Sequence, residues 1–223
     1  MAVWGAGGEY FSGPRLDDQE CLWVTWKGFM ESSNDTHVMV NAVFDNEEVG
    51  STTKQGAGST FLYDTLRRIT TARGGNEEQY LRLVANSFLM SEDNSHALHP
   101  NHVDKADPVN RPAMNGGVVI KHSANQKYAT DAVSEAVCRM VAERAGVPVQ
   151  VYTNHSDKVG GSTLGNIANS QVSLDTADIG LAQLAMHSAY ETAGTKDPEY
   201  LVRFAESFYG SRLRKKAGRI YLI

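Results

Sequence analysis

Two adjacent glutamates, Glu47 and Glu48, follow the apolar run VMVNAVF at 38–44, which predicts a buried strand. Successive side chains at a strand end point in different directions, so one carboxylate can bind a metal while its neighbour faces a substrate. Ligands of open α/β sheets bind beyond the carboxyl ends of the strands, where this pair is expected. Taken alone, the pair fits an exposed acidic turn at least as well.

Three further residues with metal-binding side chains lie at separate places in the chain. Asp17, followed by Asp18, precedes a predicted helix, although an aspartate there is also an ordinary N-cap. Asp93 follows a predicted strand, as the glutamate pair does. His187 lies in the apolar run QLAMHS, where a histidine is more often a core residue. None of the three indicates a metal site by itself.

Other candidate motifs are weaker. His96, His99 and His102 recur every three residues, but Pro100 breaks any helix that would place the rings on one face. The absence of a His-Glu-x-x-His motif argues against a helix-borne zinc protease. The run GGSTLG at 160–165 has neither the spacing of a nucleophile elbow nor the lysine of a phosphate-binding loop. We interpret it as a tight turn whose N–H groups could hold an anion or a substrate backbone.

Apolar periodicity predicts alternating helices and strands, which is typical of an α/β fold. Helices are expected at 18–31, 58–72, 77–84, 130–145 and 198–209, and strands at 38–44, 87–90, 118–121 and 147–152. The fourth helix has Thr130 or Asp131 as a cap and Gly146 as a stop, and the fifth opens on Pro198. The stretch 91–117 is long, polar and rich in histidine, so we expect it to be functional.

Composition excludes several classes of protein. The 223 residues suffice for one large domain, and a net charge of −5 argues against a nucleic-acid binder. No run of about 18 apolar residues is present, so no membrane span is expected. The N-terminus lacks the basic start and apolar run of a signal peptide, and two distant cysteines, Cys21 and Cys138, form no disulfide framework. These features predict a cytoplasmic protein.

Several motifs, in one order along the chain, resemble the aspartyl aminopeptidase family of dinuclear zinc peptidases, and its bacterial members most closely. They are PRLDD at 14–18, FDNEEVGS at 44–51, QGA at 55–57, SEDNSHALHPN at 91–101, NGGVVIKHSANQKYAT at 115–130, GGSTLGN at 160–166 and QLAMHS at 183–188. The resemblance runs from about Glu9 to about Tyr209. It implies a three-layer αβα sandwich with a mixed sheet, similar to other zinc exopeptidases.

The resemblance also implies a role for each matching residue. Asp17 corresponds to the carboxylate that bridges two metals, Glu48 and His187 to ligands of one metal, and Asp93 to a ligand of the other. Glu47 corresponds to the general base. The positions that contact substrate in the family correspond to His96, Lys121 and Tyr128.

These roles imply a metal-dependent aminopeptidase that removes N-terminal residues, preferentially Asp or Glu, from peptides. Two divalent ions, zinc in the first place and manganese or cobalt as alternatives, suit the carboxylate and imidazole ligands. A shared carboxylate would hold them about 3.5–4 Å apart, and Glu47 would take the proton of the metal-bridged water. The peptide's free N-terminus would bind one metal, and Lys121 would pair with its acidic side chain. The intact protein is expected to be a homo-oligomer.

The chain departs from the family pattern at its start. The family has another histidine ligand upstream of the RLD motif, and a smaller domain that builds the oligomer and covers the active site. We therefore expect 1–223 to be a single, N-terminally incomplete catalytic domain with an incomplete second metal site and exposed apolar sheet edges. The alternative is a non-catalytic metal- or peptide-binding fragment.

Overall fold

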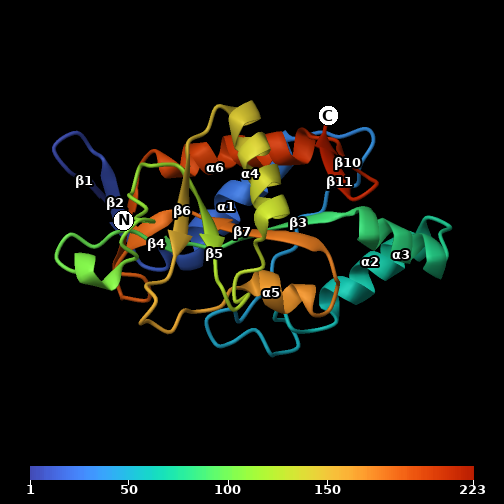
Figure 1. The fold of residues 1–223 in the computed structure, drawn as a ribbon, viewed down its shortest axis with the longest axis horizontal. Coiled ribbons are helices and arrows are strands. Elements are labelled where there is room, and N and C mark those ends of the chain that lie inside the picture. Colours follow the sequence, from blue (N-terminus) through green and yellow to red (C-terminus); the bar gives the residue numbers. More distant parts are fainter.

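A computed structural model describes all residues from Met1 to Ile223 (Figure 1). Its helices are α1 (Leu16–Glu31), α2 (Phe61–Ala72), α3 (Glu77–Asn86), α4 (Ala132–Ala145), α5 (Leu164–Asn169) and α6 (Asp197–Gly210), with a 3₁₀ turn at Val103–Lys105. Its strands are β1 (Ala2–Trp4), β2 (Tyr10–Gly13), β3 (Phe88–Glu92), β4 (Ser95–His96), β5 (Val118–His122), β6 (Val149–Thr153), β7 (Asp175–Gly180), β8 (Ala182–Leu184), β9 (Glu191–Gly194), β10 (Leu213–Lys216) and β11 (Arg219–Leu222). All five predicted helices are confirmed.

The central sheet has four strands in the order β3-β7-β5-β6. β3 runs parallel to β7, and β5 runs parallel to β6, whereas β5 and β7 are antiparallel. The predicted mixed sheet is therefore confirmed. A second sheet has the order β1-β2-β9-β8-β4, and β10 and β11 form a separate hairpin.

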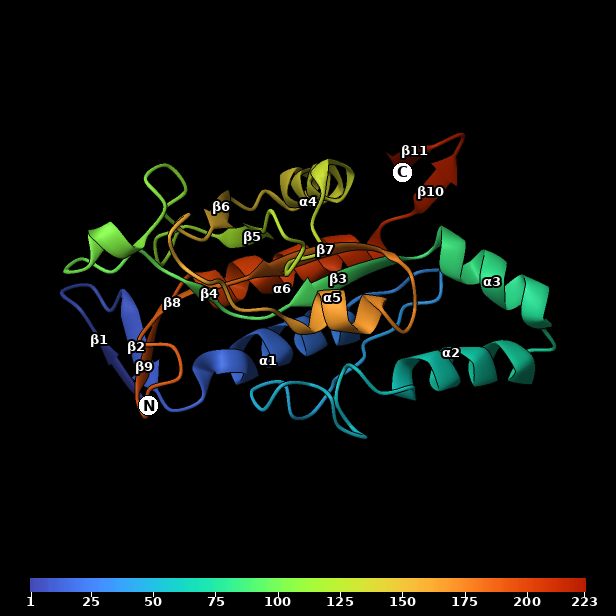
Figure 2. The ribbon, with the colours of Figure 1, turned by 60° about the horizontal axis from the view of Figure 1, so that its bottom comes forward.

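Helices cover both faces of the central sheet, which makes three layers. The main core joins α1, α4 and α6 to alternate residues of β5 and β7, among them Val118, Ile120, Ala177 and Ile179. A smaller core under α2 and α5 includes Leu62 and Ala168, and Leu89 of β3 packs against it. Figure 2 shows α4 and α5 on opposite sides of the sheet. Because strand side chains alternate, Lys121 of β5 and Asp178 of β7 point away from the main core.

The chain passes twice from the central sheet directly into the second sheet, from β3 to β4 and from β7 to β8, and Asp93 lies at the first of these junctions. β3 and β4 are separated only by Asp93 and Asn94, and β7 and β8 only by Leu181. The backbone N–H of Asp93 donates to the carbonyl of Ile179, and that of Ser95 donates to Leu181. A Cβ at Gly180 would collide with the Asp93 carbonyl, so glycine permits this close approach.

Local signals placed the helix ends correctly. The Asp131 carboxylate accepts hydrogen bonds from the N–H groups of Val133 and Ser134 at the start of α4. Gly146 ends the helix with φ 63°, a conformation that glycine adopts without steric cost. Pro198 lies in the first turn of α6, where its missing N–H is not needed.

The predicted strand at 38–44 is wrong. The segment forms no strand, and its Val38, Val40 and Val43 side chains are 65%, 39% and 51% exposed. The hydroxyl of Tyr209 donates to the carbonyl of Val40, but no strand pairs with the segment, and β3 remains an edge strand. An apolar run becomes a strand only where a neighbouring strand takes up its backbone hydrogen bonds.

The outer face of α1 is also apolar and exposed. Trp23, Trp26 and Met30 are 55%, 47% and 61% exposed, while Cys21 and Val24 on the opposite side are buried. The exposed apolar surface thus lies on a helix and on an irregular segment, whereas the expectation placed it at sheet edges. No helix of the chain has the length and apolarity that crossing a membrane requires.

The carboxyl of Glu92 makes the stability of the fold depend on pH. Burial raises its pKa to about 8, from 4.5, and its Oε2 has no hydrogen-bond partner. A raised pKa means that the folded chain holds a proton which the unfolded chain releases, so the free energy of unfolding falls as pH rises from about 5 through 8. One pKa unit corresponds to about 1.4 kcal/mol, so this single carboxyl contributes several kcal/mol to the fall.

We expect Glu92→Gln to flatten this pH dependence in urea unfolding of the metal-free chain. The slope that remains comes from the other carboxyls whose pKa is raised, among them Glu20 to about 8, Asp17 to about 9 and Glu47 to about 7. Exposed Glu78 of α3 is the matched control, and Glu78→Gln should leave the slope unchanged. An unchanged slope in Glu92→Gln would show that this carboxyl is already ionised in the folded chain.

Candidate metal centre

Three predicted ligands from distant parts of the chain converge on one point. His187 Nε2 lies 3.1 Å from Asp17 Oδ2 and 3.1 Å from Glu48 Oε2. Asp17 comes from the start of α1, Glu48 from the turn after 38–44, and His187 from the loop between β8 and β9. Two carboxylates and an imidazole at this spacing form a set suited to a divalent metal such as zinc.

A second group of carboxylates shares Asp17. Oxygens of Asp17, Asp18 and Asp93 lie within 4.8 Å of one another. Asp17 has the extended backbone angles φ −79° and ψ 113°. No side-chain hydrogen bond caps the start of α1. The N-cap interpretation of Asp17 is therefore wrong, and its carboxylate lies instead between the two groups.

The charge of these groups calls for a cation. Burial, followed by the charges of Asp93 and Glu48, raises the pKa of Asp17 to about 9. Burial and the Asp93 charge also raise the pKa of Asp18. Asp17 Oδ1 and Asp18 Oδ1 are buried without any hydrogen-bond partner. Buried carboxylates in such a cluster are ordinarily paired or bound to a metal, so the residues fit the zinc of the related peptidases.

Glu47 lies in the same electrostatic environment without joining either group. Burial, followed by the charges of Asp93 and Glu48, raises its pKa to about 7. A carboxylate with a pKa near neutrality can both accept and return a proton at physiological pH. Glu48 contacts His187, and no such ion pair involves Glu47, so the two roles that the resemblance implies for the pair stay a prediction.

Of the three expected substrate residues, Lys121 contacts Asp93 directly. The Lys121 ammonium donates to the Asp93 carbonyl at 2.9 Å, the Asn94 carbonyl at 3.1 Å and Asp93 Oδ2 at 3.4 Å. Its side chain is 2% exposed, and the ammonium lies 5.4 Å from the centroid of the buried Tyr128 ring. Partial burial and the positive charges of Lys121 and His187 lower the pKa of His96. Lys121 is thus bound to the backbone and side chain of a predicted metal ligand.

The sequence motifs do not mark two residues near the ligands as site residues. Asp18 is adjacent to Asp17 in the sequence, and its carboxylate belongs to the second group. Glu191 of β9 is 2% exposed and accepts hydrogen bonds from the N–H groups of Asp17 and His187. The adjacency of two aspartates was a usable signal for Asp18, but no local pattern marks Glu191.

The predicted tight turn at GGSTLG is wrong, because residues 160–163 are irregular and Leu164 and Gly165 begin α5. Asp178 ties this segment to the central sheet. Thr163 Oγ1 donates to Asp178 Oδ1 at 2.7 Å, and the backbone N–H of Ala129 donates to Asp178 Oδ2. The Lys127 ammonium donates to the Gly160 carbonyl at 2.8 Å. Residues 160–163 are therefore fixed to the segment that carries Tyr128.

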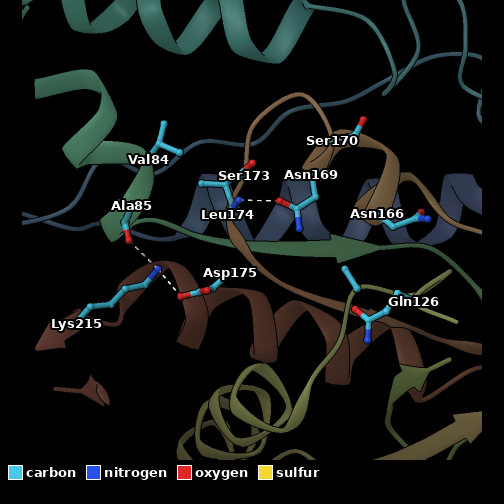
Figure 3. Close-up of a pocket in the computed structure, with 11 residues that line it drawn as sticks. Val84, Ala85, Gln126, Asn166, Asn169, Ser170, Ser173, Leu174, Asp175 and Lys215 are labelled. Carbon is cyan, nitrogen blue, oxygen red and sulfur yellow. Dashed lines mark hydrogen bonds and ion pairs between the residues drawn. The ribbon is translucent and has the colours of Figure 1, made fainter. Parts of the chain in front are cut away.

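A cavity of about 600 Å³ lies elsewhere and contains none of these residues. It is bounded by the ends of α3 and α5, by Gln126 and by the ion pair of Lys215 and Asp175 (Figure 3). Its lining has no cluster of metal-binding side chains. The convergence of the ligands, and not cavity size, therefore locates the candidate site.

Comparisons with known proteins identify relatives of the chain. A family model described as aminopeptidase I zinc metalloprotease (M18) matches residues 1–209. The chain is 45% identical over 207 residues to the probable M18 family aminopeptidase 2 of Clostridium acetobutylicum, covering 93% of this chain and 48% of that protein. It is 39% identical over 214 residues to the aspartyl aminopeptidase of Caenorhabditis elegans, covering 93% and 45%. The chain spans about half the length of these curated relatives.

Solved structures show the same fold. The crystal structure of prApe1 superposes with a TM-score of 0.86 at 30% identity, over 93% of this chain and 45% of that one. An M18-family aminopeptidase from Thermotoga maritima gives 0.83 at 27% identity, over 93% and 47%. Family model, relatives and fold agree, and this chain belongs to the M18 family of zinc metalloproteases.

Proposed function

We propose that this chain is the catalytic domain of a metal-dependent aminopeptidase, which hydrolyses N-terminal residues from peptides. One observation carries the proposal: Asp17 is shared by two groups of ligands, one with Glu48 and His187 and one with Asp18 and Asp93. A carboxylate shared by two metals is the arrangement of two-metal hydrolases. The names of the relatives, probable M18 aminopeptidase and aspartyl aminopeptidase, support the same reaction.

The proposed roles follow from position and charge. Bound divalent ions, zinc in the first place, would acidify a water molecule and polarise the scissile carbonyl. Glu47 takes the proton of the attacking water and returns it to the leaving amine, for which a pKa of about 7 is well placed. Asp93 keeps its orientation because the Lys121 ammonium holds both its carbonyl and its carboxylate.

We propose an acidic first residue, Asp or Glu, as the preferred substrate. His96, Lys121 and Tyr128 would line its side-chain pocket. The Lys121 ammonium is enclosed by three oxygen acceptors, so it would attract an acidic side chain through its charge and not by a direct hydrogen bond. The name of the Caenorhabditis elegans relative, aspartyl aminopeptidase, supports this preference.

The proposal includes a homo-oligomeric state and a cytoplasmic location for the intact protein. The Saccharomyces cerevisiae mApe1 structure, 29% identical to this chain, is a dodecamer, which supports a homo-oligomer for the intact protein. Cys21 and Cys138 are free and buried, as is usual in a reducing compartment, which supports a cytoplasmic setting.

The decisive experiment measures hydrolysis of aspartyl and leucyl p-nitroanilides by the 223-residue chain after removal of metal and addition of zinc, manganese or cobalt. We expect metal-dependent hydrolysis that is faster with the aspartyl substrate. Absence of hydrolysis with every metal would overturn the catalytic proposal for this chain. Faster hydrolysis of the leucyl substrate would overturn only the acidic preference.

A second candidate is a metal-binding domain without turnover. The observation in its favour is that only one ligand group contains an imidazole, whereas the other consists of three carboxylates, one of them held by Lys121. Counting metals by native mass spectrometry separates the two functions. Two ions per chain favour the peptidase, and one ion without hydrolysis favours the binding domain.

A further inference from the structure

We propose that Glu191 is a positioning residue that sets the distance between the metal ligands Asp17 and His187. Glu191 Oε2 accepts a hydrogen bond from the backbone N–H of Asp17 at 3.0 Å, and Oε1 accepts one from the N–H of His187 at 2.8 Å. One carboxylate thus joins two ligand-bearing segments that are about 170 residues apart. The inference rests on the proposed metal centre.

The position of Glu191 in the second sheet explains how it reaches both ligands. It is the first residue of β9 and pairs with Gly13, the last residue of β2. The chain continues from β2 to Asp17 in four residues, and the loop from β8 through His187 ends at Glu191 itself. Both ligand segments are therefore anchored at the paired residues Gly13 and Glu191, and the Glu191 carboxylate lies between the segments.

Both ligands need such support because neither has the backbone angles of a regular helix or strand. His187 has φ 66°, in the left-handed region that is sterically unfavourable for a non-glycine residue. Asp17 has non-helical backbone angles inside α1. The hydrogen bonds that the two N–H groups donate to Glu191 oppose relaxation of each backbone toward a more populated conformation.

The chemistry of Glu191 argues against a purely structural role. It is 2% exposed and forms no ion pair with Lys, Arg or His. Burying a carboxylate without a cation is costly, and an apolar side chain would complete the core with less penalty. A carboxylate has two acceptor oxygens, so it can accept a hydrogen bond from the backbone N–H of each of the two ligands.

Glu191→Gln tests this directly, because glutamine keeps the shape but offers one acceptor and one donor group. One of the two N–H groups must lose its partner. Changing groups that orient ligands typically costs 10–100-fold in metal affinity, and we expect a loss of that size for zinc. The measurement is competition with a fluorescent zinc chelator, supported by hydrogen exchange of the Asp17 and His187 amides in the metal-free chain.

Glu20→Gln is the matched control. Glu20 is also buried and accepts a hydrogen bond from Asn94 Nδ2, but it contacts neither ligand backbone. Its variant should bind zinc within about threefold of the parent, well under the 10–100-fold expected for a change at a group that orients ligands. Should Glu191→Gln fail to fold, Glu191→Asp keeps both acceptor oxygens on a shorter side chain. Its zinc affinity should be lower than that of the parent, by less than the 10–100-fold expected for Glu191→Gln.

The outcomes separate this inference from the proposed function. Parent-like zinc affinity and amide protection in Glu191→Gln would overturn the positioning role while leaving the metal centre intact. An equal affinity loss in Glu20→Gln would also overturn it, because the effect would then follow any buried acid. If the parent chain binds no zinc, the proposed metal centre is refuted. Unchanged hydrogen exchange of the His187 amide in Glu191→Gln would separately refute the hydrogen bond between His187 and Glu191.

Discussion

Replacing Asp17 with asparagine is expected to remove both metal ions from the chain and with them all measurable hydrolysis. Asp17 is the one residue common to both ligand groups, and its Oδ2 lies 3.1 Å from His187 Nε2. An amide carries no charge and is a poor metal ligand. We expect zinc affinity to fall by more than the roughly 100-fold typical of indirect changes, measured by native mass spectrometry and by chelator competition.

The same substitution should leave the metal-free fold nearly unchanged. A pKa of about 9 means that Asp17 is protonated at pH 7 without metal, and asparagine resembles the protonated form in shape and charge. Its free energy of unfolding should stay within about 1 kcal/mol of the parent's. Asp35, whose side chain is 79% exposed and pairs with Arg212, provides the control Asp35→Asn. Two bound ions in Asp17→Asn would refute the shared-ligand assignment.

Glu47→Gln is expected to abolish turnover while leaving the metals in place. Glu47 contacts no ligand, but its pKa of about 7 suits a group that takes and returns a proton. Removal of a general base typically costs 10²–10⁴-fold in rate, so we expect kcat to fall by about that factor. The measurement combines kcat for the aspartyl substrate with metal content of the same sample.

Two neighbours in the same turn serve as controls. Asp45 is exposed and only accepts a hydrogen bond from the N–H of Asn46, so Asp45→Asn should retain both activity and metal. Glu48 contacts His187, so Glu48→Gln should lose metal. Loss of metal in Glu47→Gln with retention in Glu48→Gln would mean that the two glutamates have exchanged roles.

Local features of the fold followed from the sequence because their causes are local. The N-cap of α4 needs only an aspartate at 131, and the end of that helix needs only a glycine at 146. The prediction at 38–44 failed for the complementary reason. Apolar residues in alternation describe what a segment can bury, but pairing depends on a second strand, and none lies beside this segment.

The candidate ligands were predicted from the sequence alone, through motifs that appear in family order. The convergence of these residues did not follow from the sequence. The pairing of β2 with β9 brings His187 Nε2 within 3.1 Å of Asp17 Oδ2. The same pairing creates the contact of Glu191 with both ligands, and no pattern around Glu191 announces it. Residue types define which chemistry is available, but the distances on which metal binding depends arise from contacts between residues far apart in the chain, and only the tertiary structure decides these.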